Sequence, residues 1–112
     1  MSDGDLDLSF THGNPHEVKW ARNPGDGSGD WAVFTIGEFP EAVWPDRCAA
    51  ADFNGDGRVD IIVTEENYLQ PATADNLACW WEQPAGGATS ANWERHTITA
   101  TQYTLNSLDV GD

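Results

Sequence analysis

The sequence contains few basic residues and no long apolar stretch. Lysine and arginine together number 5, against 19 aspartates and glutamates, which gives a formal net charge of −14 at pH 7. Because an acidic surface repels phosphate, this balance argues against binding of nucleic acid or of an anionic membrane surface. The absence of an apolar run of about 20 residues argues against membrane insertion through a helix. The charge favours a cation as partner, although a simply hydrated acidic surface would have the same composition.

Cysteine is also scarce, because Cys48 and Cys79 are the only two. A disulfide-dependent domain of this length would normally contain more. Helix signals are nearly absent, and glycine, proline, asparagine and aspartate interrupt the chain about every ten residues, which favours short strands joined by turns. A chain of 112 residues is long enough for one small domain or for part of a repetitive one. The N-terminal residues lack the basic and apolar segments of a secretion signal, so the sequence leaves the location open.

Four segments of the first half of the chain are similar to four segments of the second half, in the same order. DGDLDLSFTH (3–12) is similar to DGRVDIIVTE (56–65), VKWARNP (18–24) to ACWWEQP (78–84), WAVFTI (31–36) to WERHTI (93–98), and VWPDRCAAAD (43–52) to YTLNSLDVGD (103–112). Chance similarity between short apolar runs would not keep this order. The sequence therefore predicts two copies of a unit of roughly 50 to 60 residues.

Each copy contains strand-like segments of about six residues. The second copy has them at 47–52, 59–64, 77–82 and 93–98, the first at 6–11, 17–22 and 31–36, and one more lies at 105–111. Four short antiparallel strands per repeat are typical of a β-propeller blade, whereas a small β-sandwich does not require two matching units. We therefore predict an all-β chain with two blades. Strands two to four of one blade lie within 1–46, a complete blade within 47–103, and 104–112 provides the innermost strand of a blade in a neighbouring chain.

This strand order predicts that the two cysteines remain free thiols. Cys48 falls on the innermost strand of its blade and Cys79 on the third. Strands two apart in one sheet are separated by about 9.5 Å. A disulfide needs Cα atoms within about 7 Å of each other. We expect both thiols to be buried and slow to react.

The segment DFNGDGRVD (52–60) has oxygen-bearing residues at alternate positions. Five residues offer oxygens to a metal ion: Asp52, Asn54, Asp56, Asp60 and, by its backbone carbonyl, Arg58. Calcium prefers six to eight oxygen ligands at about 2.3–2.6 Å, and Gly57 permits the positive φ of a tight loop. The first half resembles an EF-hand loop, but Val63 takes the place of its final glutamate and a strand follows. A turn rich in Asp and Asn without metal is the alternative. Converging carboxylates repel one another unless a cation is present, which favours Ca²⁺.

These segments resemble FG-GAP or VCBS repeats, the blades of integrin-α-like propellers. DFNGDGRVDIIV (52–63) is similar to the family's calcium loop, and CWWEQP (79–84) with WERHTI (93–98) is similar to a WYENP…WxxHxI pattern of bacterial members. The resemblance covers essentially the whole chain. It implies a propeller blade with its innermost strand before the loop and three strands after it, and it implies Ca²⁺ as the ligand of the loop. The family is also associated with extracellular or periplasmic proteins.

The two ends of the chain resemble the two halves of a second calcium loop. Residues 3–7 match 56–60, and Asp112 matches Asp52. A loop shared between two chains would use four residues: Asp112 of one chain, and Asp3, the Asp5 carbonyl and Asp7 of the next. Its N-terminal part is one residue shorter than the intact loop.

Two blades cannot close a propeller, which usually has four to eight. The sequence therefore predicts that the partner of the chain is the chain itself, in a head-to-tail ring. A dimer, trimer or tetramer would have four, six or eight blades, and the bulky tryptophans favour an eight-bladed tetramer over a six-bladed trimer. A monomeric fragment, an engineered piece of a larger propeller or a swapped dimer are the alternatives.

Two function classes fit these observations. The first is a calcium-stabilised module with a role in structure or assembly. The second is a lectin- or adhesion-like propeller that binds a glycan or a protein, for which Trp44 and Tyr103, in loops before the innermost strands, are the candidate ligand-binding residues. The other paired tryptophans, Trp20 with Trp80 and Trp31 with Trp93, are predicted to pack between blades. No catalytic constellation is found, so we do not expect an enzyme.

Overall fold

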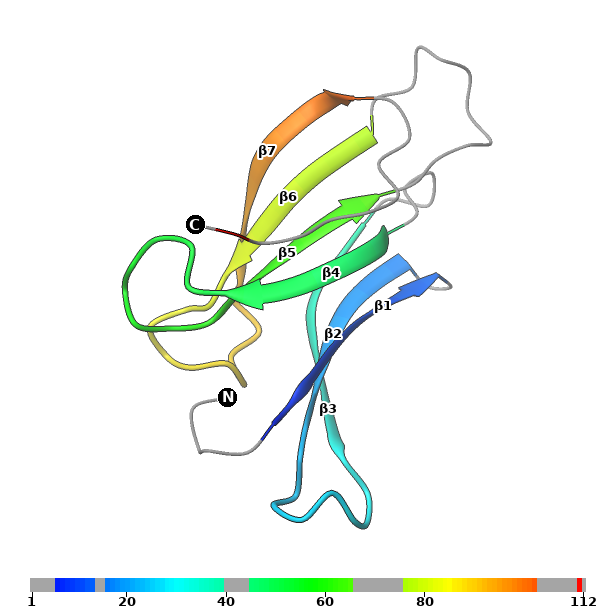
Figure 1. The fold of residues 1–112 in the computed structure, drawn as a ribbon, viewed down its shortest axis with the longest axis vertical. Helices are drawn as coiled ribbons and strands as arrows, with labels where there is room; N and C mark the ends of the chain where they lie inside the picture. The colour runs from blue at the N-terminus through cyan, green and yellow to red at the C-terminus, as the bar shows by residue number, and fades with distance from the viewer. Residues whose placement is uncertain (1–5, 14–15, 40–44, 66–75, 103–110, 112) are drawn as a thin grey trace.

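The computed structural model describes residues 6–13, 16–39, 45–65, 76–102 and 111. These residues form seven strands in two antiparallel sheets (Figure 1). The three-stranded sheet contains, in spatial order, β1 (Leu8–Gly13), β2 (His16–Arg22) and β3 (Ala32–Glu38). The four-stranded sheet contains, in spatial order, β4 (Pro45–Ala51), β5 (Asp60–Glu65), β6 (Asn76–Glu82) and β7 (Glu94–Gln102). No helix among the described residues has the length and apolar character needed to cross a membrane.

The predicted all-β class is confirmed, and each of the seven predicted strands that falls within the described residues overlaps an observed one. In both sheets the strands follow the chain in simple up-and-down order, as in a propeller blade. Neither sheet closes on itself within the described part of the chain. The predicted strand at 105–111 lies almost wholly outside the described residues. The closed ring and the division of the chain into blades therefore remain predictions.

The pairing of the strands follows the sequence repeat residue by residue. Two cross-strand rows occupy equivalent positions in the two sheets: Ser9, Trp20 and Phe34 in one, and Ile62, Trp80 and His96 in the other. Both sheets also contain a β-bulge at the same place, between Val18 and Lys19 and between Ala78 and Cys79. The first sheet is therefore a copy of β5, β6 and β7, and among the described residues it has no counterpart of β4.

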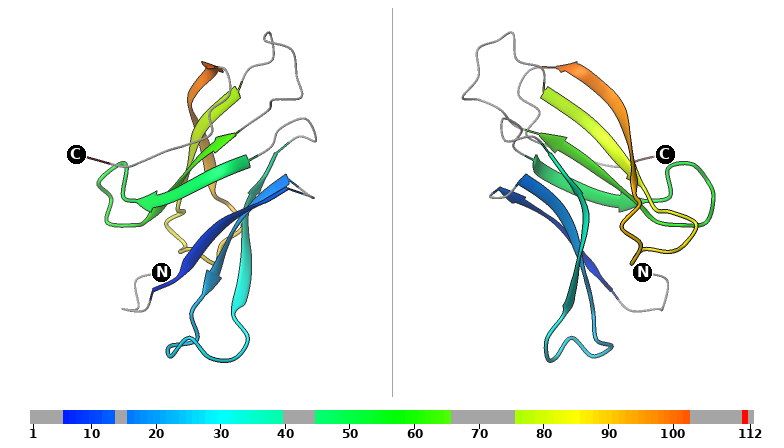
Figure 2. Two further views of the ribbon diagram at one scale, coloured as in Figure 1. Left: turned by 45° about the vertical axis from the view of Figure 1, so that its right-hand side comes forward. Right: turned by 180° about the vertical axis from the view of Figure 1, so that it is seen from behind.

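The two sheets pack face to face, with β1 of one sheet beside β4 of the other (Figure 2). Side chains from both sheets and from the β6–β7 loop form one apolar core: Val18, Trp20, Ile36, Phe39, Ile61, Val63, Cys79, Trp81, Ala88 and Trp93. Phe39 contacts Trp81 edge to face, with ring centroids 5.8 Å apart. Gly37 lies directly against the same ring, because a Cβ on this glycine would lie 2.2 Å from Cη2 of Trp81. The packing of the two sheets thus depends on a residue without a side chain at position 37.

Both cysteines are free thiols in the structure, as predicted. Cys48 on β4 and Cys79 on β6 each pair with Val63 on β5, so one strand lies between them. Cys79 is buried and Cys48 is half-buried, with its Sγ 3.7 Å from the Ser9 Oγ. Burial raises the pKa of the Cys48 thiol above its ordinary value, an effect that the hydrogen bond to Ser9 partly opposes.

Only some of the tryptophans predicted to pack between blades are buried between the two sheets. Trp20 and Trp93 are buried between the sheets, and both indole N–H groups donate to the carbonyl oxygen of Ala88. Trp31 instead lies before β3 and donates to the Gly27 carbonyl of its own loop at 3.3 Å. Trp80 is only half-buried, because its neighbour Trp81 faces the other sheet. Alternation along β6 gives the two adjacent tryptophans opposite faces, and the sequence alone did not show which of them points inward.

Candidate metal centre

The predicted calcium loop is the connection between β4 and β5. It leaves β4 at Ala51 and re-enters the sheet at Asp60, the first residue of β5. Gly55 and Gly57 have φ values of 75° and 86°, in the left-handed region that favours glycine. These two positions allow the backbone to curl back on itself, so that amide groups within the loop turn inward.

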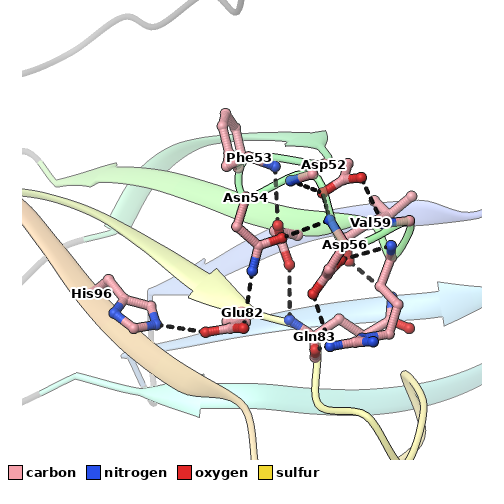
Figure 3. A network of polar contacts seen from close by, with 12 residues as sticks. Asp52, Phe53, Asn54, Asp56, Val59, Glu82, Gln83 and His96 are labelled. Carbon is pink, nitrogen blue, oxygen red and sulfur yellow. Dashed lines mark hydrogen bonds and ion pairs between the residues drawn. The ribbon is translucent and has the colours of Figure 1, made fainter.

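The carboxylate of Asp52 organises the inward-turned amides. Its Oδ1 accepts hydrogen bonds from the backbone N–H groups of Gly55 (2.8 Å) and Asp56 (3.1 Å). Its Oδ2 accepts one from Gly57 at 2.8 Å. The loop therefore wraps around the first acidic residue of the motif, and both oxygens of that carboxylate point into it (Figure 3).

The next two polar side chains continue this pattern. Asn54 Oδ1 accepts a hydrogen bond from the Asp56 N–H at 3.2 Å, and Asp56 Oδ1 accepts one from the Arg58 N–H at 2.8 Å. The guanidinium of Arg58 forms an ion pair with Asp56 Oδ2 at 2.8 Å and donates through Nε to the Gln83 carbonyl at 3.2 Å. The arginine thus neutralises one loop carboxylate directly.

Asp60 differs from the other acidic residues because its side chain is wholly buried, at 0% exposure. Oδ2 accepts a hydrogen bond from the Phe53 N–H and Oδ1 one from the Gln83 N–H, both at 3.0 Å. Gln83 completes the link by donating through Nε2 to the Val59 carbonyl at 2.8 Å. Burial of a carboxylate is costly unless hydrogen bonds satisfy it. Here they do so by joining the loop, the start of β5 and the end of β6.

A chain of polar contacts leads from the loop across the edge of the four-stranded sheet. Asn54 Nδ2 donates to Glu82 Oε2 at 2.9 Å, and Glu82 Oε1 lies 2.8 Å from His96 Nε2 (Figure 3). Within the described ranges, one group of three acidic, histidine or cysteine side chains brings its ligand atoms within 4.8 Å of one another, namely Glu82, Glu94 and His96. These three residues are close enough to share one metal ion.

The predicted ligands of the intact loop all lie at the same end of the sheet, and they supply only oxygen. Asp52, Asn54 and Asp56 are exposed, whereas Asp60 closes the base of the loop. A set of carboxylates, an amide oxygen and a backbone carbonyl suits calcium by its chemistry. In the structure these oxygens bond to amide groups and to Arg58. A bound cation would therefore replace the Arg58 guanidinium as the counter-charge of Asp56.

The second, split loop is described at one residue only. Asp7 Oδ1 accepts a hydrogen bond from the Asn23 N–H at 2.9 Å, and Asn23 Nδ2 donates to the Leu6 carbonyl at 3.1 Å. Asp3, Asp5 and Asp112 lie outside the described residues, as do Trp44 and Tyr103, the two candidates for ligand binding.

Sequence reasoning did not identify the polar residues that follow and flank the loop. Gln83, Glu82, Glu94 and His96 all contact it or extend its network. For Gln83 the sequence did contain a signal. Gln83 is equivalent to Asn23 in the repeat, and both are amide residues directly after a strand. For the other three residues no local pattern points to the loop.

Comparison with known protein families agrees with this architecture. A family model described as an FG-GAP-like repeat matches residues 1–63, more than half of the chain. The chain belongs to this family. The matched region includes all of the first sheet and, in the second, β4, the acidic loop and most of β5. No curated protein and no solved structure matches the FG-GAP-like chain in the corresponding searches.

Proposed function

We propose that this FG-GAP-like chain is a calcium-binding module with a structural rather than a catalytic role. The intact loop would bind one Ca²⁺ through Asp52, Asn54, Asp56, the Arg58 carbonyl and Asp60. The observation that carries the proposal is the arrangement around Asp52, where three backbone amides hold both carboxylate oxygens inside a loop with further acidic side chains. Bringing several carboxylates together is unfavourable unless positive charge offsets their repulsion, and Arg58 provides such a charge for Asp56.

The position of the loop explains why an ion there would stabilise the fold. Asp60 connects the loop to the end of β6 through Gln83, and Asn54 connects it to Glu82 on the same strand. An ion bound to Asp52, Asn54 and Asp60 would therefore fasten β4, β5 and β6 at one end of the sheet. A ligand that binds only the folded state adds about 4 kcal/mol of stability when present at a thousand times its dissociation constant.

The second loop is proposed to bind calcium in the same way, between chains. The support for it is Asp7, which makes the same backbone contact as Asp60 at the equivalent position of the repeat. Asp112 of one copy would join Asp3, the Asp5 carbonyl and Asp7 of the next. This second ion would depend on assembly, whereas the first would not.

Calorimetric titration with Ca²⁺ and thermal melting with and without EDTA test the proposal. Wild-type protein should bind at least one ion per chain, and EDTA should lower its melting temperature. Asp56→Asn retains the acceptor for the Arg58 N–H but loses the charge, so the affinity should fall by about tenfold or more. Asp30→Asn, the same change at an exposed residue before β3, is the matched control and should leave binding unchanged. A wild-type melting temperature that does not respond to EDTA or Ca²⁺ would overturn the proposal.

A further inference from the structure

Each sheet has two faces that correspond between the two copies of the repeat. The tryptophan face contains Ser9, Trp20, Phe34 and Ile36 in the three-stranded sheet, and Ile62, Trp80, His96 and Ile98 in the four-stranded sheet. The reverse face contains Leu8, Phe10, Ala21 and Val33 in the three-stranded sheet, and Ile61, Val63, Trp81 and Arg95 in the four-stranded sheet. These assignments follow from the strand pairing and from the alternation of side chains along each strand.

Within the chain, one tryptophan face packs against one reverse face. The tryptophan face of the three-stranded sheet covers the reverse face of the four-stranded sheet, and both contribute to the buried core. Trp20 and Ile61 are each 0% exposed, and Ile36 is 3% exposed. The chain thus contains one complete example of a blade-to-blade contact.

Three of the equivalent residues on the other two faces are exposed. Ile98 occupies the bulge position of Ile36 but is 55% exposed, and Leu8 occupies the position of Ile61 but is also 55% exposed. Val33, which is in the same cross-strand row as Leu8 but on the far side of Ala21, is 53% exposed. One tryptophan face and one reverse face therefore remain without a partner sheet in the described part of the chain. Apolar side chains on each are accompanied by polar ones: Glu82, Glu94 and His96 on the first face, and Lys19 and Thr35 on the second.

We propose that a second copy of this chain covers them. The tryptophan face of the four-stranded sheet would dock on the reverse face of the three-stranded sheet of the next copy, and so repeat the contact already present inside the chain. This inference rests on the proposed structural role but not on calcium binding. Its strongest support is the match between the two tryptophan faces. Trp20 stacks on Phe34 at 4.8 Å and 23°, and Trp80 stacks on His96 at 4.4 Å and 22°.

Residue sizes on the open faces are also complementary. Inside the chain, Trp81 on the reverse face needs the space left by Gly37 beside the tryptophan face. On the open reverse face the residue equivalent to Trp81 is Ala21, and in the sequence the residue equivalent to Gly37 is Thr99. In the proposed contact, the small alanine would therefore stand in the place of the tryptophan, and the larger threonine in the place of the glycine.

The proposed contact joins the open tryptophan face of one copy to the open reverse face of the next, so each copy can bind one neighbour through each face. Contacts of this kind produce a closed ring when the rotation between copies divides a full turn, and an open filament otherwise. With two blades per copy, a trimer or a tetramer would have six or eight blades, within the range of four to eight that is usual for propellers.

Light scattering on the full chain, with one charged substitution per open face, tests the docking. Val33→Asp disrupts the open reverse face, and Ile98→Asp disrupts the open tryptophan face. Wild-type protein should have three or four times the chain mass of 12.2 kDa, and each variant alone should have the mass of one chain. Because each variant retains the face that the other has lost, an equimolar mixture should form a dimer with one copy of each. Ala91→Asp, which introduces the same charge at an exposed residue of the β6–β7 loop, should assemble as wild type does.

Several outcomes would overturn the inference: a monomeric wild type, variants that remain assembled, or a mixture that stays monomeric. Circular dichroism checks that the variants are folded, and Leu8→Asp replaces Val33→Asp should the latter fail that check. A monomer whose tryptophan fluorescence changes with an added oligosaccharide would assign the open tryptophan face to a glycan instead. A wild type that binds Ca²⁺ but is monomeric contradicts this inference alone, and one that assembles without binding Ca²⁺ contradicts the proposed function alone.

Discussion

Asp7 and Asp60 accept the same hydrogen bond at equivalent places in the two sheets. Each carboxylate Oδ1 receives a backbone N–H from the amide residue that follows the next strand, from Asn23 at 2.9 Å and from Gln83 at 3.0 Å. Each of these amide side chains donates in turn to the carbonyl of the residue before the aspartate. The repeated unit therefore includes a specific polar link as well as four strands, and this link closes the base of the acidic loop in the complete blade.

The link predicts unequal costs for removing the two aspartates. Asp60→Ala leaves the N–H groups of Phe53 and Gln83 without their acceptor in a fully buried place, which should destabilise the fold by roughly 2 to 4 kcal/mol. Asp7→Ala should cost about half as much, because Asp7 is only half-buried and water can replace it. Urea unfolding in EDTA measures both values without a contribution from calcium. Equal costs for the two variants would contradict this account.

Gly37 predicts an effect on packing that is separate from the acidic loop. Gly37→Ala would place its Cβ 2.2 Å from Cη2 of Trp81, so the two sheets would have to separate or the ring would have to move. Overpacking of this kind costs about 1 to 3 kcal/mol. Gly86→Ala is the matched control, since the nearest atom to its Cβ is Ser90 Cβ at 4.0 Å. Chemical unfolding should show a loss for the first variant only, and Trp81→Phe should recover part of that loss in the double variant.

The strands and the repeat were predictable from the sequence because both are local patterns. Alternating apolar residues define each strand, and the ordered similarity of two half-chains defines the unit. The two sheets agree with both predictions. The strand ends shift by a few residues, as expected where a terminal residue such as Trp31 bonds to its own loop rather than to the sheet.

The remaining features depend on contacts between residues distant in the sequence. Which of Trp80 and Trp81 faces the core is decided by the pairing register, and a one-residue change would exchange them. The role of Gly37 arises only when the second sheet brings Trp81 against it. The loop residues Asp52, Asn54 and Asp56 followed from their spacing, but the burial of Asp60 and the contact of Asn54 with Glu82 required the fold.

Cys48 predicts a pH-dependent reactivity that reports on the folded state. Burial raises its pKa, so the thiolate, which is the reactive form, is rarer than in an exposed cysteine. Alkylation at pH 8 should therefore be slow in the native protein and fast in urea, with no Cys48–Cys79 link found by mass spectrometry. Because the pKa of this thiol is higher in the folded than in the unfolded state, its contribution to the stability of the fold is fully present at low pH. That contribution is lost as pH rises above the ordinary pKa of about 8.5. Native alkylation as fast as in urea would contradict the observed burial.

Arg58 predicts that one substitution should strengthen calcium binding. Its guanidinium pairs with Asp56 Oδ2 at 2.8 Å, so in the ion-free loop it holds the position of a counter-charge that a cation would take over. Arg58→Ala keeps the backbone carbonyl proposed as a ligand but removes this competitor and its repulsion of a divalent ion. At water-like screening that repulsion amounts to roughly 1 kcal/mol, which corresponds to a several-fold gain in affinity.

Arg95→Ala, the same change at an exposed residue of β7, should have a smaller effect. Calorimetric titration at low and at high salt shows how much of the gain in affinity comes from removing the charge, because salt screens the repulsion between Arg58 and the ion. An Arg58→Ala affinity equal to or below that of wild type would show that the guanidinium supports the site instead of competing for it.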